Sequence, residues 1–250
     1  IFDSPDAQEP LSMLQLAWRG LAATGLAPHC LICAGENQVA EINQQISSAQ
    51  VITEPFSHDT FAAIALACSY IYSVLQRPQE EVVCFIPVDT CAAPTYYELI
   101  NRLPVYLKSS GADIILMGVQ PDSPSSSYGY LVPQSPAEPQ LKPTGEVSPT
   151  LHGWQRVQRF VEKPDPPLAA ELLAAGALWN AGVFCFRLEF MLTALQARAL
   201  PDTYARLRQV YGLLPQQSFD YEVLQQQPAL AVAPYGGAWA DAGSWQSVRK

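Results

Sequence analysis

Two aspartates that follow short apolar or small-residue segments are the first candidates for chemistry. Asp89 comes directly after the apolar run 82–88 (VVCFIPV), and Asp241 lies among small residues in 239–245 (WADAGSW). Carboxylates suit a hard cation such as Mg²⁺, which proteins hold with one or two acidic side chains together with substrate phosphates. Plainer interpretations stay open: Asp89 caps the following helix or closes a turn, and Asp241 or Ser244 caps a helix.

A second group of polar residues lies at the ends of two predicted strands. Glu162 and Lys163 are adjacent in 160–164 (FVEKP), and Asn180 stands beside small residues in 179–184 (WNAGVF). Successive strand residues point to opposite faces, so we expect Glu162 and Lys163 to have different roles rather than to pair with each other. Lys163 is either a phosphate ligand or a solvated edge lysine. Asn180 either binds sugar hydroxyls or serves as an ordinary turn residue.

Several other kinds of chemistry lack their motifs in this sequence. It contains no G-x-G-x-x-G, no Walker loop and no G-x-S-x-G elbow, so dinucleotide, P-loop and serine-hydrolase sites are not indicated. Its three histidines, His29, His58 and His152, show no metal-ligand spacing. Cys30 and Cys33 have the spacing of a zinc or redox pair, but no second pair exists, so we interpret them as structural.

Charge and hydropathy limit the partners. Acidic residues outnumber basic ones 23 to 14, giving a net charge of -9. Nucleic acids and anionic membranes are bound by clustered Lys and Arg, so the composition argues against both. No run approaches the ~20 apolar residues of a membrane span, and residues 1–10 lack a signal-peptide pattern. We therefore expect a soluble, cytoplasmic protein.

Helical and strand patterns alternate along the chain. Helices are expected where apolar residues recur at helical spacing, and strands where short apolar runs occur. The expected helices cover 12–24, 40–48, 60–75, 96–109, 166–175, 189–199, 203–211 and 221–226. The expected strands cover 29–34, 50–52, 81–87, 113–119, 128–132, 157–162, 182–187 and 229–234. The continuously apolar run 81–87 predicts a central strand covered on both faces.

This alternation predicts an α/β fold with a doubly wound, mostly parallel sheet in a three-layer α/β/α arrangement. One domain covering 1–250 is the simplest organisation, with residues 121–150, rich in Pro, Ser and Gln, as an excursion over the active-site face. Ligands of such sheets bind beyond the carboxyl ends of the strands, which is where Asp89 would lie.

Eight segments in this order resemble the bacterial mannose-1-phosphate guanylyltransferases, which are sugar-1-phosphate nucleotidyltransferases. The match covers nearly the whole chain, and eight motifs in register are specific where each alone is weak. The segments are 12–15 (SMLQ), 54–67 (with EP, HDT and AAIALA), 82–89 (VVCFIPVD), 128–130 (YGY), 160–165 (FVEKPD), 178–186 (LWNAGVFCF), 219–221 (FDY) and 239–245 (WADAGSW).

The resemblance implies a Rossmann-like nucleotidyltransferase fold, also described as GT-A-like, and an in-line reaction. An oxygen of mannose 1-phosphate attacks the α-phosphorus of GTP, which releases pyrophosphate and forms GDP-mannose. Asp89 and Asp241 would hold Mg²⁺, and Lys163 would bind the phosphate of mannose 1-phosphate. Substrate contacts are further implied for Gly129, Glu162 and Asn180 on the sugar side, for Glu54 and Thr60 towards the nucleotide, and for Asp220. The oligomeric state stays open, a homodimer included.

Three departures from the family pattern matter. Such enzymes open with a strand and a glycine-rich loop carrying an Arg and then a Lys, whereas this chain starts after that point, so we expect it to be nearly inactive as given. The usual Asp-His is Asp89-Thr90 here, and Arg-Asn-Thr is His58-Asp59-Thr60. An acidic Asp59 would repel nucleotide phosphates, which puts the choice of nucleotide in question.

Other functions remain in competition with this one. They are a nucleotidyltransferase for another sugar or base, a non-catalytic sugar-nucleotide-binding module, and a glycosyltransferase. The last is weakened because no D-x-D pair is present in the sequence.

Overall fold

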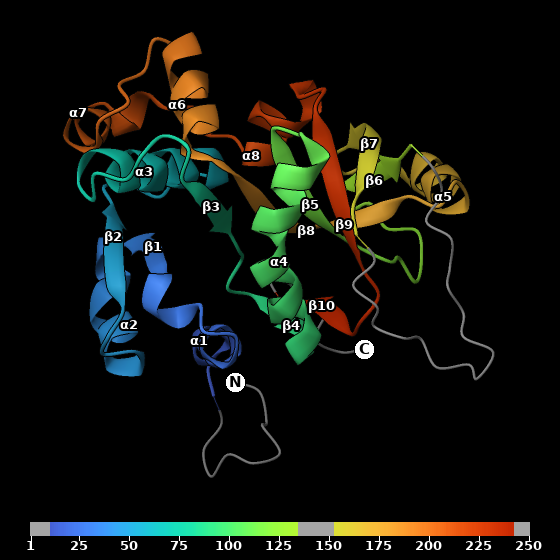
Figure 1. The fold of residues 1–250 in the computed structure, drawn as a ribbon, viewed down its shortest axis with the longest axis horizontal. Coiled ribbons are helices and arrows are strands. Elements are labelled where there is room, and N and C mark those ends of the chain that lie inside the picture. Colours follow the sequence, from blue (N-terminus) through green and yellow to red (C-terminus); the bar gives the residue numbers. More distant parts are fainter. Residues whose placement is uncertain (1–10, 135–152, 243–250) are drawn as a thin grey trace.

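A computed structural model of the protein describes residues 11–134 and 153–242, and it has a six-stranded sheet at its centre (Figure 1). The strands β3, β5, β6 and β9 point in one direction, and β7 and β8 point in the opposite one. In spatial order they are β3 (Val82–Phe85), β8 (Leu178–Arg187), β5 (Ile114–Val119), β9 (Leu230–Tyr235), β7 (Gln155–Val161) and β6 (Tyr130–Pro133).

Helices cover both faces of this sheet and four of its six strands point in one direction, which confirms the predicted doubly wound α/β fold. Among the neighbouring pairs of this sheet in the described residues, only β5 and β9 are hydrogen-bonded in parallel. One face packs against α3 (Thr60–Ser73), α6 (Leu188–Ala197), α7 (Tyr204–Gln209) and α8 (Phe219–Glu222). The other face packs against α1 (Met13–Ala23), α4 (Pro94–Ser110) and α5 (Pro166–Ala174). No helix within the described ranges is both long and apolar enough to cross a membrane.

Strand β5 shows why the sequence folds in three layers. All six of its residues are buried, and side chains alternate between the two faces of a strand. Ile114 and Leu116 belong to the core under α3 and α6, whereas Ile115 and Met117 belong to the core under α4. A continuously apolar strand is thus required by burial on both sides.

Strand β3 corrects one prediction. Its run was expected to form a central strand, but β3 has a single neighbour, β8, among the described strands and lies at the edge of the sheet. Val83 packs on one face, and Val82 and Cys84 pack on the other, so the strand is covered on both faces as predicted. A continuously apolar sequence therefore indicates that both faces of a strand are buried. It does not indicate how many strands pair with it.

Two small sheets complete the described strands. The strands β1 (Leu31–Gly35) and β2 (Gln50–Glu54) pair in parallel beside α2 (Val39–Gln45). The strands β4 (Thr90–Ala92) and β10 (Trp239–Asp241) pair antiparallel, and we call them the β4–β10 ribbon. Sequence patterns did not predict the ribbon, because three residues are too few to show a period of two.

The six cysteines differ in burial. All six are free thiols, and Cys68 and Cys185 are fully buried. Burial raises the pKa of Cys33 to about 12, with a further contribution from the Glu54 carboxylate. Metal binding and redox chemistry need the thiolate, so this shift agrees with a structural role for the Cys30 and Cys33 pair.

Candidate active site

Asp89 and Asp241, far apart in sequence, meet at the β4–β10 ribbon. Asp241 is the register partner of Thr90, and the backbone N–H of Ala242 donates to the Asp89 carbonyl at 2.7 Å. The helix-capping interpretation of Asp89 is wrong, since the N-cap of α4 is Ala93, which supplies no side-chain cap. The corresponding interpretation, with Asp241 or Ser244 as the cap of a following helix, concerns residues from 243 on, which lie outside the described residues; Asp241 itself is the last residue of β10.

The electrostatics of this pair fit a divalent cation. Burial raises the pKa of Asp89, and repulsion from the Asp241 carboxylate raises it further. A cation between two such carboxylates would relieve the repulsion, and Mg²⁺ is typically held by one or two carboxylates plus substrate phosphates. Within 11–134 and 153–242, no three His, Cys, Asp or Glu side chains are grouped so that they could hold a metal ion.

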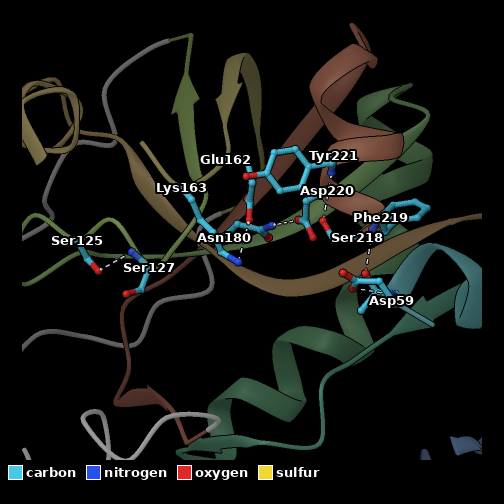
Figure 2. Close-up of polar contacts among 11 residues, drawn as sticks. Asp59, Ser125, Ser127, Glu162, Lys163, Asn180, Ser218, Phe219, Asp220 and Tyr221 are labelled. Atoms are coloured by element: carbon cyan, nitrogen blue, oxygen red, sulfur yellow. Dashed lines mark hydrogen bonds and ion pairs between the residues drawn. The ribbon is translucent and has the colours of Figure 1, made fainter. Parts of the chain in front are cut away.

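Glu162, Lys163, Asn180 and Asp220 come from three different elements and converge in one place, which we call the sugar cluster (Figure 2). The Asn180 amide donates to the Asp220 carboxylate at 2.7 Å, and the Lys163 ammonium lies 3.9 Å from the Glu162 carboxylate. Ionised carboxylates accept hydrogen bonds, an amide does both, and an ammonium attracts phosphate. The cluster therefore combines the groups that a phosphorylated sugar needs.

The carboxylates of the sugar cluster are hard to ionise. Burial raises the pKa of Glu162 to about 7, and the Asp220 carboxylate contributes while Lys163 opposes the shift. Burial likewise raises the pKa of Asp220 to about 6, although the hydrogen bond from Asn180 and the charge of Lys163 lower it. The negative charge of Asp59 raises both pKa values further, so three acidic side chains lie close enough to affect one another.

Glu162 and Lys163 were expected not to pair, and this expectation is wrong. The strand β7 ends at Val161, so the alternation of faces does not continue to these residues. Lys163 has a positive φ of 42°, which turns its backbone and leaves its side chain near the carboxylate of Glu162. A non-glycine residue in this region is strained by about 1–3 kcal/mol, and such strain concentrates at functional sites.

Asn180 is positioned by an irregularity in β8. The strand was expected to begin at Gly182, but it begins at Leu178, which places Asn180 inside it. The register with β5 shifts near Gly182, whose φ is 71°, and the Gly182 N–H donates to the Asn180 side-chain oxygen at 3.1 Å. Such bulges re-aim neighbouring side chains. Here the bulge orients the amide so that its nitrogen faces Asp220.

The backbone of Gly129 contacts two residues of the sugar cluster, Asn180 and Glu162. Its carbonyl accepts from the backbone N–H of Asn180 at 2.8 Å. A Cβ atom at this position would collide with the Glu162 carboxylate and would lie 2.9 Å from the Phe160 ring. The residue is therefore a glycine because two side chains approach its backbone closely.

Thr60 and Asp59 begin α3 close to the sugar cluster. Asp59 accepts from the backbone N–H of Thr60 at 2.7 Å, and the Thr60 hydroxyl accepts from the N–H of Phe219 at 2.9 Å. Thr60 thus ties α3 to α8, which carries Asp220. This tie was not foreseen, since Thr60 was expected to lie towards a nucleotide.

Glu54 lies apart from the sugar cluster, in a cavity of about 490 Å³. Its carboxylate accepts from the Tyr211 hydroxyl at 2.6 Å, and the His58 ring stacks on Tyr211 with centroids 5.0 Å apart. Sequence reasoning did not find Tyr211, which no motif marks. The cavity is lined by Gly35, Glu36, Asn37, Gln38, Glu54, Pro55, Phe56, Ser57 and His58.

A larger cavity of about 750 Å³ lies between α1, α4 and β4. Arg19 and Arg102 line it, together with Glu98 and Tyr97. It shares all three residues of β4, Thr90, Cys91 and Ala92, with the ribbon but none of the residues predicted for the site.

Three aromatic rings that contact one another lie between the sugar cluster and the ribbon. Tyr128 precedes Gly129, Trp179 precedes Asn180, and Trp239 lies in β10. The rings of Tyr128 and Trp179 are 4.6 Å apart between centroids, and Tyr128 is 5.6 Å from Trp239. We call these residues the aromatic triad.

Sequence comparison finds relatives of known name. The chain is 26% identical over 95% of its length to the alginate biosynthesis protein AlgA of Pseudomonas aeruginosa. It is also 26% identical over 95% of its length to a mannose-1-phosphate guanylyltransferase of Escherichia coli. It covers 51% and 52% of these two proteins, so the chain spans about half the length of the curated relatives it matches.

Solved structures share the fold. The crystal structure named mannose-1-phosphate geranyltransferase from Thermus thermophilus matches 94% of this chain and 68% of that one, with a TM-score of 0.75 and 23% identity. A putative glucose-1-phosphate thymidylyltransferase from Bacillus anthracis matches 95% of this chain and 79% of that one, with a TM-score of 0.57 and 13% identity. The family model described as nucleotidyl transferase matches residues 7–250. The chain therefore belongs to the nucleotidyl transferase family.

Proposed function

We propose that this protein is a mannose-1-phosphate guanylyltransferase, which joins mannose 1-phosphate and GTP to give GDP-mannose and pyrophosphate with the help of Mg²⁺. The observation that carries the proposal is the meeting of Asp89 and Asp241 on one ribbon, next to the aromatic triad. The name of the Escherichia coli relative supports the choice of sugar and base.

The sugar cluster supports a sugar-phosphate substrate. Lys163 would pair with the phosphate, while Glu162, Asn180 and Asp220 would hold sugar hydroxyls. An oxygen of the bound phosphate forms a bond to the α-phosphorus of the nucleotide, and the bond to the leaving pyrophosphate breaks in line. That oxygen is already ionised near neutral pH, so the residues need only position it and balance charge. Mg²⁺ held by Asp89 and Asp241 would neutralise charge on the phosphates.

The Glu54 cavity supports a purine with hydrogen-bond donors. Guanine presents a ring N–H and an amino group side by side, and a carboxylate can accept from both. Glu54 already accepts from Tyr211, which holds the carboxylate in place, and Asn37 and Gln38 line the same cavity. GTP is therefore the nucleotide we propose.

Asp59 favours a second candidate, a nucleotidyltransferase for another sugar or base. Its carboxylate adds negative charge to a space that already contains Glu162 and Asp220. A phosphate placed there would be repelled, whereas a substrate with a different pattern of polar groups would be tolerated.

The test is release of pyrophosphate from a matrix of nucleoside triphosphates and sugar 1-phosphates, with and without Mg²⁺. The proposed function predicts the highest kcat/KM for GTP with mannose 1-phosphate. Asp89→Asn and Asp241→Asn should abolish release, whereas Asp122→Asn, an exposed aspartate in a loop, should not.

The outcomes separate the competing functions. A higher kcat/KM for another pair would replace the proposed substrates by the second candidate. Binding of both substrates without any Mg²⁺-dependent release above that of Asp89→Asn would favour a sugar-nucleotide-binding module. Unchanged release in both aspartate variants would remove the metal assignment.

A further inference from the structure

The β4–β10 ribbon, which carries Asp89 and Asp241 at its end, is not hydrogen-bonded to the six-stranded sheet within the described residues. It consists of three register pairs, from Trp239 with Ala92 to Asp241 with Thr90. A two-stranded ribbon is marginally stable by itself. Its orientation relative to the sugar cluster must therefore come from side-chain packing.

Packing holds the ribbon at two places. At the turn that enters β10, the Tyr235 hydroxyl donates to the Ala238 carbonyl at 3.3 Å and lies 3.3 Å from the Thr95 hydroxyl. Within β10, Trp239 packs against the core that includes Tyr128 and Trp179. Residues two apart on a strand share a face, so Trp239 lies on the same face of β10 as Asp241.

The aromatic triad spans from Trp239 to the sugar cluster. The ring of Trp239 meets Tyr128 edge to face at 67°, and its centroid lies 6.4 Å from that of Trp179. Such ring pairs are more stable than the area that they bury would make them. Tyr128 and Trp179 are the chain neighbours of Gly129 and Asn180, and Trp179 is only 7% exposed.

Within the described residues, the indole N–H groups of Trp179 and Trp239 add no hydrogen bond to this arrangement, so these two side chains act through their rings. The Nε1 atoms of Trp179 and Trp239 are both buried and have no hydrogen-bond partner within the described part of the chain. Leaving a buried donor without a partner has a cost in stability. The rings are kept in place at that cost, which indicates that their shape is what the site requires.

We propose that Trp239 is a positioning residue, whose ring sets the carboxylates of Asp89 and Asp241 at a fixed place relative to the sugar cluster. This proposal rests on the proposed nucleotidyl transfer and adds a residue to it. Loss of the ring should misplace the cation and lower kcat. Binding of the sugar phosphate should change little, because Glu162, Lys163 and Asn180 belong to the main sheet and the loop after it.

The test compares Trp239→Leu, Trp239→Phe and the control Trp154→Leu, whose indole N–H donates to Ser109 at 2.8 Å outside the triad. Binding of Mn²⁺ is measured from the electron paramagnetic resonance signal of the free ion, without substrates. The values of kcat and KM come from pyrophosphate release. We expect Trp239→Leu to weaken Mn²⁺ binding and to lower kcat about tenfold or more, with KM for the sugar phosphate within about twofold. Trp239→Phe should recover most of both losses.

Two results would overturn the proposal. One is that Trp239→Leu binds Mn²⁺ as tightly as the unchanged protein. The other is that Trp239→Phe loses as much Mn²⁺ binding and kcat as Trp239→Leu, because the indole N–H and not the ring would then be responsible. If Trp239→Leu does not fold, as judged by circular dichroism, Tyr128→Leu removes the partner ring and must give the same split between Mn²⁺ binding and KM. The Mn²⁺ titration decides the matter even if no substrate pair is turned over. Failure of the proposed function would instead appear as absent pyrophosphate release from the unchanged protein.

Discussion

The amide of Asn180 holds the carboxylate of Asp220 at 2.7 Å and is itself held by the N–H of Gly182 at 3.1 Å. The second bond fixes which atom of the amide is the oxygen. Its nitrogen must then face Asp220, and the orientation of the pair follows from the bulge in β8. One backbone irregularity thus organises the sugar end of the candidate site.

Asn180→Ala should weaken sugar-phosphate binding. The substitution removes a hydrogen bond to a charged group, which contributes about 1.5–3 kcal/mol, so KM for the sugar phosphate should rise roughly tenfold to a hundredfold. It should also raise the pKa of Asp220 further, because the bond from Asn180 lowers it now. Isothermal titration with mannose 1-phosphate measures the loss, and exposed Asn101→Ala on α4 is the control. An unchanged KM would exclude Asn180 from the sugar cluster's function.

The pKa of Glu162 predicts how stability depends on pH. Burial, with a contribution from Asp220, raises this pKa from 4.5 to about 7 in the folded protein. Between these values the folded state binds more protons than the unfolded state, so the free energy of unfolding falls as pH rises through that window. The stabilising contribution of protonated Glu162 is complete below the unfolded pKa and is lost as pH passes the folded one.

Thermal melting from about pH 5 to about pH 8 checks this sign. Tm should fall with rising pH in the unchanged protein. Glu162→Gln should reduce the slope, most clearly between about pH 6 and pH 7, because the amide cannot ionise, whereas Asp220, whose pKa is also raised to about 6, still contributes at lower pH. Glu171→Gln, an exposed residue on α5, should leave the slope as it is. A slope of the same size in Glu162→Gln would show that another group is responsible.

Gly129→Ala should damage the site and the fold together. The added methyl group would overlap the Glu162 carboxylate and press on the Phe160 ring, and overpacking of this kind destabilises by about 1–3 kcal/mol. Urea unfolding gives the change in stability, and KM for the sugar phosphate should rise because Glu162 must move. Gly212→Ala, where the nearest other atom is 3.8 Å away, is the matched control. Equal behaviour of the two variants would contradict the close approach.

Much of the fold was predictable because burial leaves a pattern in the sequence. The fully buried strand β5 and the helix α3, which has eight buried residues, appear as apolar runs of the right length. The ribbon and the edge position of β3 were not predictable, since hydrogen-bond partners across a sheet do not alter side-chain polarity. The same limit hid the bulge at Gly182, which one glycine among small residues does not mark.

Residues of the candidate site that belong to recognisable motifs could be predicted from the sequence. Residues that take part only through contacts between distant parts of the chain could not. Asp89 and Asp241 were expected at one place from family resemblance, and they share the ribbon. Tyr211 was missed because its contact with Glu54 joins residues 157 positions apart and no motif contains it. The pairing of Glu162 with Lys163 was missed because the strand ends one residue earlier than expected.

Tyr211→Phe should affect the nucleotide and leave the sugar phosphate alone. The Tyr211 hydroxyl donates to Glu54 at 2.6 Å, and burial together with this bond raises the pKa of the tyrosine, so it remains a donor at neutral pH. Without the donor the Glu54 carboxylate loses its orientation, and a bond to a charged group contributes about 1.5–3 kcal/mol. KM for GTP should rise roughly tenfold or more, while KM for mannose 1-phosphate stays within about twofold. The exposed Tyr221→Phe, beside the sugar cluster, provides the contrast, because it keeps the Glu54 cavity intact. A rise in both KM values for Tyr211→Phe would mean that Tyr211 acts through the general packing of α3, and Glu54 would then lose its place in nucleotide binding.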